Sequence, residues 1–419
     1  MAAIFKIAKK LRPQSGFVLV TSVFIMLLIL SLALYVTSFT LTEMRISDSQ
    51  KTSVQTYYLA EAGVAEAIWK IKNDPAWKTA FETNPSWSID YTRNPALYSN
   101  GSYKIQIQNT GNAKGEITVT AKLNLGLNSS QRVIKTSIFK ALGESVIGTN
   151  AEYADGNIDM SGSVLHVWGG GLFSNNNIII NYESTINVDK DINAVGNVNI
   201  NKSATVVASS THAANYPPKP SPIAMPSVSF NTAGDANSLK ARASHIYTAN
   251  QFSDLLWANR GKTTTLNGIT YVTGDVDIKA DADMVINGAL VADGDITLGT
   301  NTLFCCWNWY CGDHRANVTV NREAGTTTPS GIFSQGQVNM ELCLGNLNIQ
   351  GLVYAANKIN MFSFSNSANI TGGVASWKLT LTSLWQGINI IYDNPTISYG
   401  LGNPQFSPIV TVDHWEEEY

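Results

Sequence analysis

The first strong pattern along the chain is an uninterrupted apolar run near the N-terminus. No charged residue occurs between Phe17 and Thr42, and the next residue, Glu43, is acidic. About 25 residues of helix rise about 37 Å, which is enough to cross a bilayer core of about 30 Å. A cleavable secretory segment has a shorter apolar core that is followed by a small-x-small site, and no such site follows this run. The pattern therefore predicts a retained transmembrane helix.

Helical periodicity continues beyond this membrane-sized segment. Apolar residues recur at steps of mostly three and four, at Val54, Tyr58, Ala62, Ala65, Ile68 and Trp69. This spacing predicts one apolar stripe that packs on a folded body. Pro75 ends the pattern, because proline cannot continue a helix. We therefore expect one helix over residues 17–73, about 85 Å long, with half of it in lipid and half against a globular domain.

Strand-like alternation follows the helix within residues 74–145. Three stretches that begin at Ser102, Glu116 and Gln131 alternate apolar and polar residues, and turn residues separate them. These stretches predict an antiparallel meander, one face of which packs on the exported half of the helix.

A repeat of about 20 residues fills residues 146–400. Its frame is a small or apolar residue, a polar turn that often contains Gly, and then alternating apolar residues. The aligned apolar positions lie about 20 residues apart, except for steps of about 78 and 42, and are Ile158, Ile178, Val198, Val276, Ile296, Val338, Ile359 and Leu379. A constant period with strand-like alternation predicts a solenoid whose turns share one core. We expect a right-handed parallel β-helix, because leucine-rich repeats need a leucine frame and a β-sandwich does not explain the period.

The long steps in this repeat fall near multiples of 20, so insertions or degenerate turns would fill them, and we expect insertions at about 209–262 and 303–328. The first contains five prolines between His212 and Phe230, which predict an irregular segment, with short helices near Ser238 and Gln251. Residues 401–419 follow the repeat as a C-terminal tail. The predicted fold is therefore mainly β, with a long N-terminal helix, a meander and a solenoid.

The composition excludes several classes of function. The net charge is −3 and 14% of the residues are charged, which argues against nucleic acid as a partner. No nucleophile–base motif, phosphate-binding loop or zinc-protease motif occurs, so we assign no catalytic residues, no cofactor and no enzymatic activity.

Four cysteines lie close together in the sequence, at Cys305, Cys306, Cys311 and Cys343. In an exported chain they predict two disulfides, and three connectivities remain open. Zinc bound with His314 is the alternative, but adjacent cysteines are awkward ligands and the paired C-x2-C spacing of structural zinc sites is missing.

Aromatic residues lie between these cysteines, at Trp307, Trp309 and Tyr310. Rigid aromatic side chains in a covalently closed loop predict a ligand-binding surface if they are exposed. The alternative is that these three side chains cover the end of the solenoid.

Calcium is a second metal alternative, since carboxylates on successive turns can bind it. The candidates are Asp275, Asp277, Asp281, Asp283, Asp293 and Asp295. The glycine-rich nonapeptide frame of calcium-binding β-rolls is missing, and aspartate suits solenoid corners because its side chain bonds to backbone. We therefore expect corner roles and assign no metal ligands.

The N-terminal residues resemble a known signal. Lysines and an arginine precede the apolar run, so residues 1–16 are expected to be cytoplasmic and the rest exported. A short basic leader that ends in Gly16, followed by Phe17 and a long apolar helix, resembles the prepilin signal of type IV pilins and type II secretion pseudopilins. Residues 55–68, QTYYLAEAGVAEAI, resemble the helix signature of PilX-type minor pilins.

This resemblance implies a processing step and a set of partners. A prepilin peptidase would cut between Gly16 and Phe17, and the helix would then pack with other pilins, minor pilins and inner-membrane assembly proteins, using residues that include Thr21, Glu43 and Arg45. Major pilins carry a glutamate as the fifth mature residue, where this chain has Thr21. That departure favours a tip subunit over a shaft subunit.

The resulting expectation is a minor pilin-like component of a type IV pilus or related filament. It would start as a single-pass inner-membrane protein with an exported body, and would reach the cell surface with the pilus. At the tip it would initiate assembly or adhere to a glycan, a host surface or an abiotic surface. The alternative is a membrane-anchored extracellular β-helix protein that binds or cleaves polysaccharide.

Overall fold

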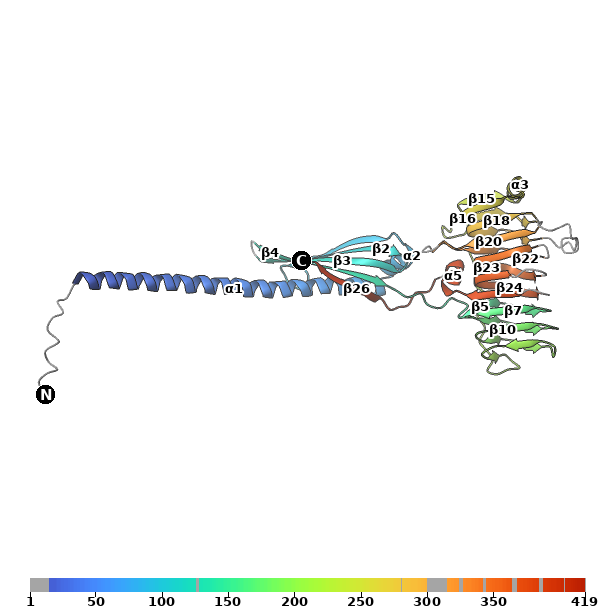
Figure 1. The fold of residues 1–419 in the computed structure, drawn as a ribbon, viewed down its shortest axis with the longest axis horizontal. Coiled ribbons are helices and arrows are strands. Elements are labelled where there is room, and N and C mark those ends of the chain that lie inside the picture. Colours follow the sequence, from blue (N-terminus) through green and yellow to red (C-terminus); the bar gives the residue numbers. More distant parts are fainter. Residues whose placement is uncertain are drawn as a thin grey trace. The chain divides into compact units, whose positions relative to one another are not determined.

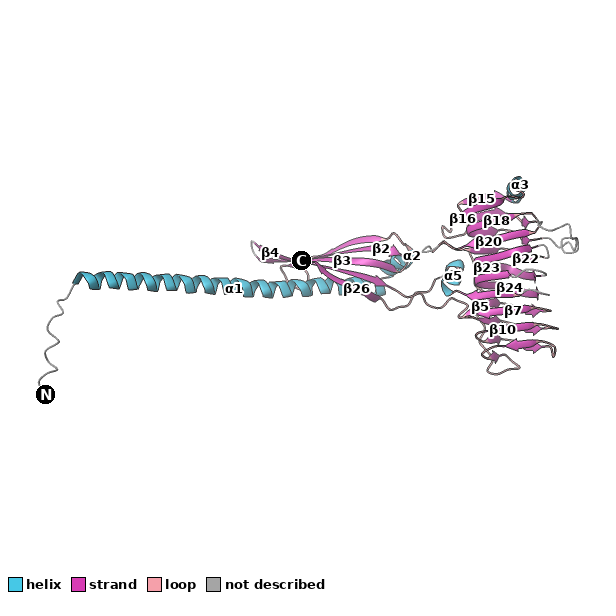
Figure 2. Ribbon diagram, in the orientation of Figure 1, coloured by secondary structure: helices cyan, strands magenta, loops and turns pink. Residues whose placement is uncertain are grey.

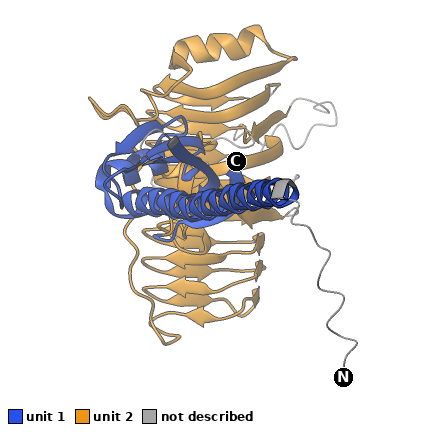
Figure 3. Cartoon of the chain, turned by 90° about the vertical axis from the view of Figure 1, so that its left-hand side faces the viewer, with its two compact units in different colours: residues 1–141, 408–419 blue, residues 142–407 orange. Residues whose placement is uncertain are grey.

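The computed structural model describes residues 15–125, 128–279, 281–299, 315–323, 327–341, 344–363, 368–383, 387–402 and 404–418. The chain forms two compact units, which Figure 3 colours separately. The first unit comprises residues 1–141 and 408–419, and the second comprises residues 142–407. The chain therefore leaves the first unit, builds the whole second unit, and returns to the first for its last residues.

The first unit begins with a single long helix, as the sequence predicts. Helix α1 spans Ser15–Asn73 and helix α2 spans Pro75–Thr83 (Figures 1 and 2). Asp74 separates them, and its Oδ1 accepts a hydrogen bond from the backbone nitrogen of Ala76 at 2.9 Å. Such an N-cap starts a new helix at the proline that ends the old one, which confirms the expected boundary.

An antiparallel sheet accompanies the helix, with strand order β1-β2-β3-β4-β26. Its strands are β1 Ser88–Arg93, β2 Gly101–Gly111, β3 Lys114–Leu125, β4 Asn128–Phe139 and β26 Thr411–Glu418. The three strands predicted from the alternating stretches are confirmed as β2, β3 and β4. Strands β1 and β26 were not predicted.

Strand β26 corrects the interpretation of residues 401–419 as a tail. Thr411 pairs with Phe139 at the end of β4, and the antiparallel pairing continues along both strands. The acidic run of β26 lies beside basic residues of β4, and Glu417 Oε1 is 3.5 Å from Arg132 Nη1. The last strand therefore covers the edge of β4, and the entire second unit is an insertion between two neighbouring strands.

The C-terminal half of α1 packs on this sheet through small and aliphatic side chains. The fully buried helix residues are Thr56, Leu59, Ala60, Val64, Ala67 and Ile71. Gly63 lies in the same row, and a Cβ atom there would be 2.6 Å from Val119 Cγ1. The helix therefore approaches β3 more closely than a side chain would allow.

The predicted packing stripe of α1 is wrong in its direction. Val54, Tyr58 and Trp69 are 52%, 56% and 61% exposed and lie away from the sheet. The helix carries two apolar stripes, and the sheet covers the one that contains Gly63, where the helix approaches most closely. The other stripe carries the aromatic residues; we call it the outer stripe, and it consists of Val54, Tyr58, Ala62, Ala65 and Trp69. Ile68, the remaining residue of the predicted stripe, is half-buried.

The second unit is a parallel β-solenoid, as the 20-residue repeat predicts. Its described residues form about ten turns that are spaced by about 21 residues. The first group of strands is β5 Asn150–Ala154, β6 Ile158–Met160, β7 Val164–Trp168, β8 Gly171–Ser174, β9 Ile178–Ile180, β10 Thr185–Val188, β11 Ile192–Ala194, β12 Val198–Ile200, β13 Thr205–Val207 and β14 Thr211–His212. The second group is β15 His245–Thr248, β16 Thr263–Thr273, β17 Val276–Ile278, β18 Asp283–Ala292, β19 Ile296–Leu298, β20 Ala316–Asn321, β21 Gly331–Ser334, β22 Gln337–Met340, β23 Leu344–Ser363, β24 Ala368–Ser383 and β25 Ile388–Tyr392. The described helices of this unit are α3 (Ala249–Ala258) and α5 (Asn394–Gly400) (Figure 1).

The eight aligned positions of the repeat form one continuous column in the solenoid core. Each side chain is buried and pairs with the next along the stack. The order along the column is Val276, Ile296, Val338, Ile359, Leu379, Ile158, Ile178 and Val198. The period of the sequence therefore gives the register of the turns correctly.

The order of the turns differs from the order of the sequence. Leu379, near the end of the solenoid segment, pairs with Ile158 near its beginning. The chain thus enters the solenoid at mid-stack, builds outwards to His212, crosses to the far end and builds back towards its starting turn. The step of about 78 residues between Val198 and Val276 is therefore the crossing between the two ends, and not an insertion between neighbouring turns.

Residues 213–244 make this crossing along the outside of the solenoid. The predicted irregular conformation is confirmed, since this fully described segment contains no helix or strand. Tyr153 Oη donates to Ile223 O at 2.8 Å, and Asn231 Nδ2 donates to Asp293 Oδ1 at 3.1 Å. The segment therefore bonds to turns from both halves of the stack. No helix forms near Ser238, whereas α3 forms at the second predicted helix.

The 42-residue step is one enlarged turn, as the predicted insertion implies, but the bounds 303–328 need correction. Residues Ala316–Asn321 form β20, which pairs with β18 on one side and β23 on the other. Ile296 and Val338 are direct neighbours, so the step of about 42 residues spans one enlarged turn.

Polar side chains join successive turns at one corner of the solenoid. Asp275 Oδ1 accepts a hydrogen bond from the backbone nitrogen of Asp295 on the next turn, at 2.8 Å. Asn157 and Asn177 form the same bond one residue before their column positions, at 3.2 Å. The Asp or Asn of the repeated frame therefore satisfies a backbone donor that the turn leaves free.

Candidate functional site

No side chain of the described residues covers the N-terminal part of α1. Phe17 is 65% exposed, and the apolar side chains that follow it to Leu41 are also exposed. Among the described residues, α1 is the one helix that is long and apolar enough to cross a membrane. Bare apolar surface of this extent needs lipid or a protein partner.

Helix α1 includes the bond at which processing is predicted. The described helix begins at Ser15, so Gly16 and Phe17 both have helical backbone. Residues 1–14 of the predicted leader lie outside the described residues. Cleavage after Gly16 stays a prediction.

Thr21 makes its hydrogen bonds within the helix. Its Oγ1 lies 2.9 Å from Phe17 O and 3.0 Å from Val18 O, to which it can donate. The other hydroxyls that donate to a preceding turn of this segment belong to Ser22, Ser31, Thr37, Thr40 and Thr42. Each of these polar groups is satisfied without water, as an environment of lipid or packed helices requires.

Glu43 and Arg45 are exposed on α1 just after the apolar segment. Arg45 lines a polar groove of about 1010 Å³ between α1 and β4, together with Asp48, Lys51 and Arg132. This groove begins where the charge-free part of the helix ends.

The cysteine and aromatic candidates lie outside the described residues. Cys305, Cys306, Cys311, Trp307, Trp309 and Tyr310 fall in residues 300–314, and Cys343 falls in 342–343. The strands that precede these two segments are neighbours, because Leu298 of β19 pairs with Met340 of β22. The disulfides and the aromatic surface stay predictions.

The aspartates considered for calcium bond to the protein itself. Asp283 accepts from Asn317 at 2.7 Å, Asp295 accepts from the backbone nitrogen of Gln337 at 2.8 Å, and Asp281 pairs with Arg260. In the part of the chain that the structure describes, no three His, Cys, Asp or Glu side chains converge as metal ligands would. Asp275 and Asp295 have the corner role expected from the sequence, since each accepts a hydrogen bond from a backbone nitrogen of the next turn, whereas Asp277 and Asp283 lie on strands β17 and β18.

A groove beneath α3 was not identified from the sequence. It has a volume of about 510 Å³, and its lining includes Trp257 of α3 and Asp277 of β17. Trp257 is 76% exposed. A signal was present, since this tryptophan lies in the segment near Gln251 for which the sequence predicts a short helix.

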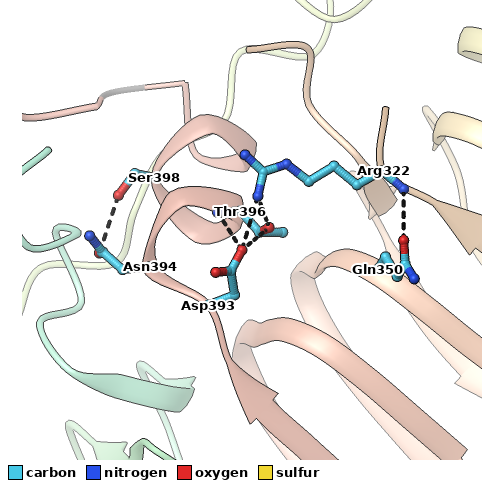
Figure 4. Close-up of polar contacts among 6 residues, drawn as sticks. All are labelled: Arg322, Gln350, Asp393, Asn394, Thr396 and Ser398. Carbon is cyan, nitrogen blue, oxygen red and sulfur yellow. Dashed lines mark hydrogen bonds and ion pairs between the residues drawn. The ribbon is translucent and has the colours of Figure 1, made fainter. Parts of the chain in front are cut away.

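A polar cluster fixes the place where the chain enters and leaves the solenoid (Figure 4). Asn394 Nδ2 donates to Gly143 O at 2.7 Å, and Asn394 Oδ1 accepts from Ser145 N at 2.8 Å. Beside it, Arg322 Nη1 donates to Asp393 Oδ2 at 3.0 Å and to Thr396 Oγ1 at 2.8 Å. Asn394 thus holds the entering segment at the first turn of α5, and Gly143 N donates to Gln405 O of the leaving segment at 2.7 Å.

The solenoid core contains one carboxyl group at an aliphatic position. Glu152 pairs in register with Val374 on one side and Leu172 on the other. It is fully buried, and neither of its oxygens has a hydrogen-bond partner among the described residues. Burial raises the pKa of Glu152 to about 8, because the charged form loses its hydration. At neutral pH the group is therefore mostly protonated.

No family model matches the chain, and no curated protein matches it in sequence. Among solved structures, the chain is similar to the competence-associated pilin ComZ from Thermus thermophilus. The identity is 12% and the TM-score 0.23, and the alignment covers 88% of this chain and 97% of that chain. This likeness is distant, and the function proposed below rests on the chain's own residues.

Proposed function

We propose that the chain is a minor pilin-like subunit of a type IV pilus or related filament, of the PilX type, with the solenoid as its exposed head. The observation that carries the proposal is the outer stripe of α1. A single-pass anchor needs only about 20 apolar residues. Here a second apolar surface continues along the exported half of the helix, where Tyr58 and Trp69 are 56% and 61% exposed.

The outer stripe favours packing between subunits over simple anchoring. The opposite side of the same helix is already covered by its own sheet, so the outer stripe is free for another helix. Its residues recur at steps of three and four, which is the spacing that helix–helix packing uses. Neighbouring pilin helices supply an apolar partner of that shape, whereas water does not.

The proposed position is the filament tip. Thr21 stands where a shaft subunit would carry the glutamate that pairs with a neighbour's amino terminus, and its hydroxyl bonds within its own helix. A solenoid inserted between β4 and β26 also adds a bulky head to one sheet of the pilin-like unit. At the tip, this head would initiate assembly or adhere to a surface, without a catalytic step.

Analysis of the mature N-terminus tests the proposal. The native protein is purified from membranes, and its intact mass and N-terminal sequence are determined. We expect a chain that starts at Phe17, with or without a methyl group on the new amine, because a prepilin peptidase removes residues 1–16. A mature chain that still starts at Met1 would rule out the pilin-like role.

A further inference from the structure

We propose that the groove beneath α3 binds a linear polysaccharide of low charge, with one sugar ring stacked on Trp257. This proposal names a ligand class for the adhesive head and rests on the proposed function for its biological setting. The binding itself depends only on the second unit, in which α3 lies at the end of the stack beside β15 (Figure 1).

A capping box and a buried phenylalanine fix helix α3 on the end of the solenoid, and neither involves Trp257. Thr248 and Gln251 form a capping box, with a distance of 2.9 Å from Thr248 N to Gln251 Oε1. Phe252 is 1% exposed and closes the end of the core, with Leu255 packed beside it. Trp257, at 76% exposed, therefore presents a large rigid ring at the groove at little conformational cost.

The groove wall opposite α3 is polar and carries more acidic than basic side chains, since Asp275, Asp277 and Asp281 line it together with Lys279. Asp277 points outwards from β17, and Lys279 follows that strand as an exposed residue, because the alternating residues Val276 and Ile278 occupy the core. Lys279 Nζ lies 3.8 Å from Asp277 Oδ2. Across the groove, the other basic lining residue, Arg260, is paired with a carboxylate. A wall of this kind offers donors and acceptors to hydroxyl groups, but it lacks the excess of positive charge that a polyanion needs.

A second groove lies on the same column of outward side chains. Asp277 pairs in register with Thr297, Thr297 with Asn339, and Asn339 with Asn360. The second groove has a volume of about 330 Å³, and Asn339, Asn360 and Thr380 line it. Neighbouring strands lie about 4.8 Å apart, so the two grooves follow each other along this column with Thr297 between them, and together they make up the proposed track. An elongated ligand fits such a track better than a single small molecule.

The chemistry of the track matches a saccharide. A sugar ring has an apolar face that stacks on an aromatic ring and hydroxyls that bond to amides and carboxylates at its edges. Along the column, Asn360 Nδ2 already donates to Asn339 Oδ1 at 2.7 Å, which holds the two amides in a fixed orientation. Repeating polar side chains along one line suit a polymer of repeating units.

Binding of defined oligosaccharides to the purified full-length chain in detergent tests the proposal. The probes are disaccharides and hexasaccharides of glucan, mannan and chitin type, measured by titration calorimetry. We expect at least one series to bind, with the hexasaccharide tighter than the disaccharide. Trp257→Ala should weaken both by about tenfold, the effect of losing one stacked ring. Trp377→Ala is the matched control, since Trp377 is 51% exposed but lies outside both grooves, and it should change neither.

A variant in the second groove separates a track from a single pocket. Asn360→Ala should weaken the hexasaccharide several-fold and leave the disaccharide unchanged. The proposal is overturned if no oligosaccharide binds, if Trp257→Ala binds as tightly as Trp377→Ala, or if single-stranded DNA binds in place of saccharide. This assay needs no filament, so the two proposals can fail separately. If the native chain starts at Met1 but binds saccharide, only the proposed function is contradicted. If the native chain starts at Phe17 but binds no saccharide, only this inference is contradicted.

Discussion

At the residue scale, the repeated frame contains glycine because a larger side chain at that position would collide with a neighbouring turn. A Cβ atom at Gly294 would lie 2.0 Å from Asp275 Oδ1, the same atom that accepts the backbone hydrogen bond from Asp295. Gly336 is in the same position relative to Asp295, with a distance of 2.1 Å. The glycine therefore makes room for the inter-turn hydrogen bond, and the two features of the frame depend on each other.

Gly294→Ala should consequently destabilise the solenoid. The new methyl group displaces the Asp275 side chain and breaks its bond to the next turn, so we expect a loss of about 1–3 kcal/mol in the free energy of unfolding, measured with urea. Gly387→Ala is the matched control, because the nearest atom to its Cβ would be 3.4 Å away, an ordinary contact. Equal losses in the two variants would contradict the steric account.

Glu152 gives the stability of the solenoid a dependence on pH. Burial raises the pKa of Glu152 from 4.5 to about 8. Below pH 4.5 both the folded and the unfolded chain hold the proton, so the group costs nothing through ionisation. As the pH rises from 4.5 to 8, the unfolded chain releases the proton and the folded chain keeps it, so stability falls; above pH 8 the loss is complete.

Glu152→Gln should remove this dependence. We expect the variant to unfold at a free energy similar to that of the wild type at pH 4, and to be more stable at pH 9 by an amount on the order of 4 kcal/mol. Urea denaturation of both proteins at the two pH values measures the difference. A gap between variant and wild type that is the same at pH 4 and pH 9 would show that ionisation of Glu152 is not its source.

At the scale of elements, the sequence was most informative where one pattern had one interpretation. The column from Val276 to Val198 was predictable because each turn must place an aliphatic residue in a shared core. The meander and α3 were predictable for the same reason, since alternation and helical spacing each match a single element type.

The direction of α1 was not predictable, because two apolar stripes compete on one helix. Ala60 and Ala67 look less hydrophobic than Tyr58 and Trp69, yet the smaller side chains face the sheet. Close approach at Gly63 decides the outcome, and it depends on the shape of the sheet, which no helical pattern contains. The same limit applies to β26. Its acidic residues are typical of a solvated tail, and only the pairing with basic residues of β4 shows that they form a strand.

At the scale of the whole molecule, the order of solenoid turns was hidden from the sequence. The repeat specifies that turns stack, but any turn can stack on any other through the same aliphatic column. The pairing of Leu379 with Ile158 closes the two halves into one stack with the chain ends at its middle. Leu142 and Phe406 pair beside each other there, so both connections to the first unit leave from one place.

This arrangement suits a head that is carried by a filament. The chain connects the solenoid to β4 and β26, two paired strands of one sheet. The crossing segment forms hydrogen bonds with both halves of the solenoid along its outside. In the proposed function, the apolar part of α1 supplies the surface for assembly, and the proposed track on the solenoid supplies the surface for a ligand. Assembly into a filament is thus the central claim.

Recovery of the chain in sheared filaments tests that claim most directly. Filaments are sheared from cells that express the wild type, Trp69→Glu, or the control Lys72→Glu, which changes an exposed polar position of the same helix. We expect the wild type and Lys72→Glu in the filament fraction, and at least about tenfold less Trp69→Glu, because a charge in the outer stripe is costly to bury between helices. Equal recovery of Trp69→Glu, or absence of the wild type from filaments that do form, would contradict the account.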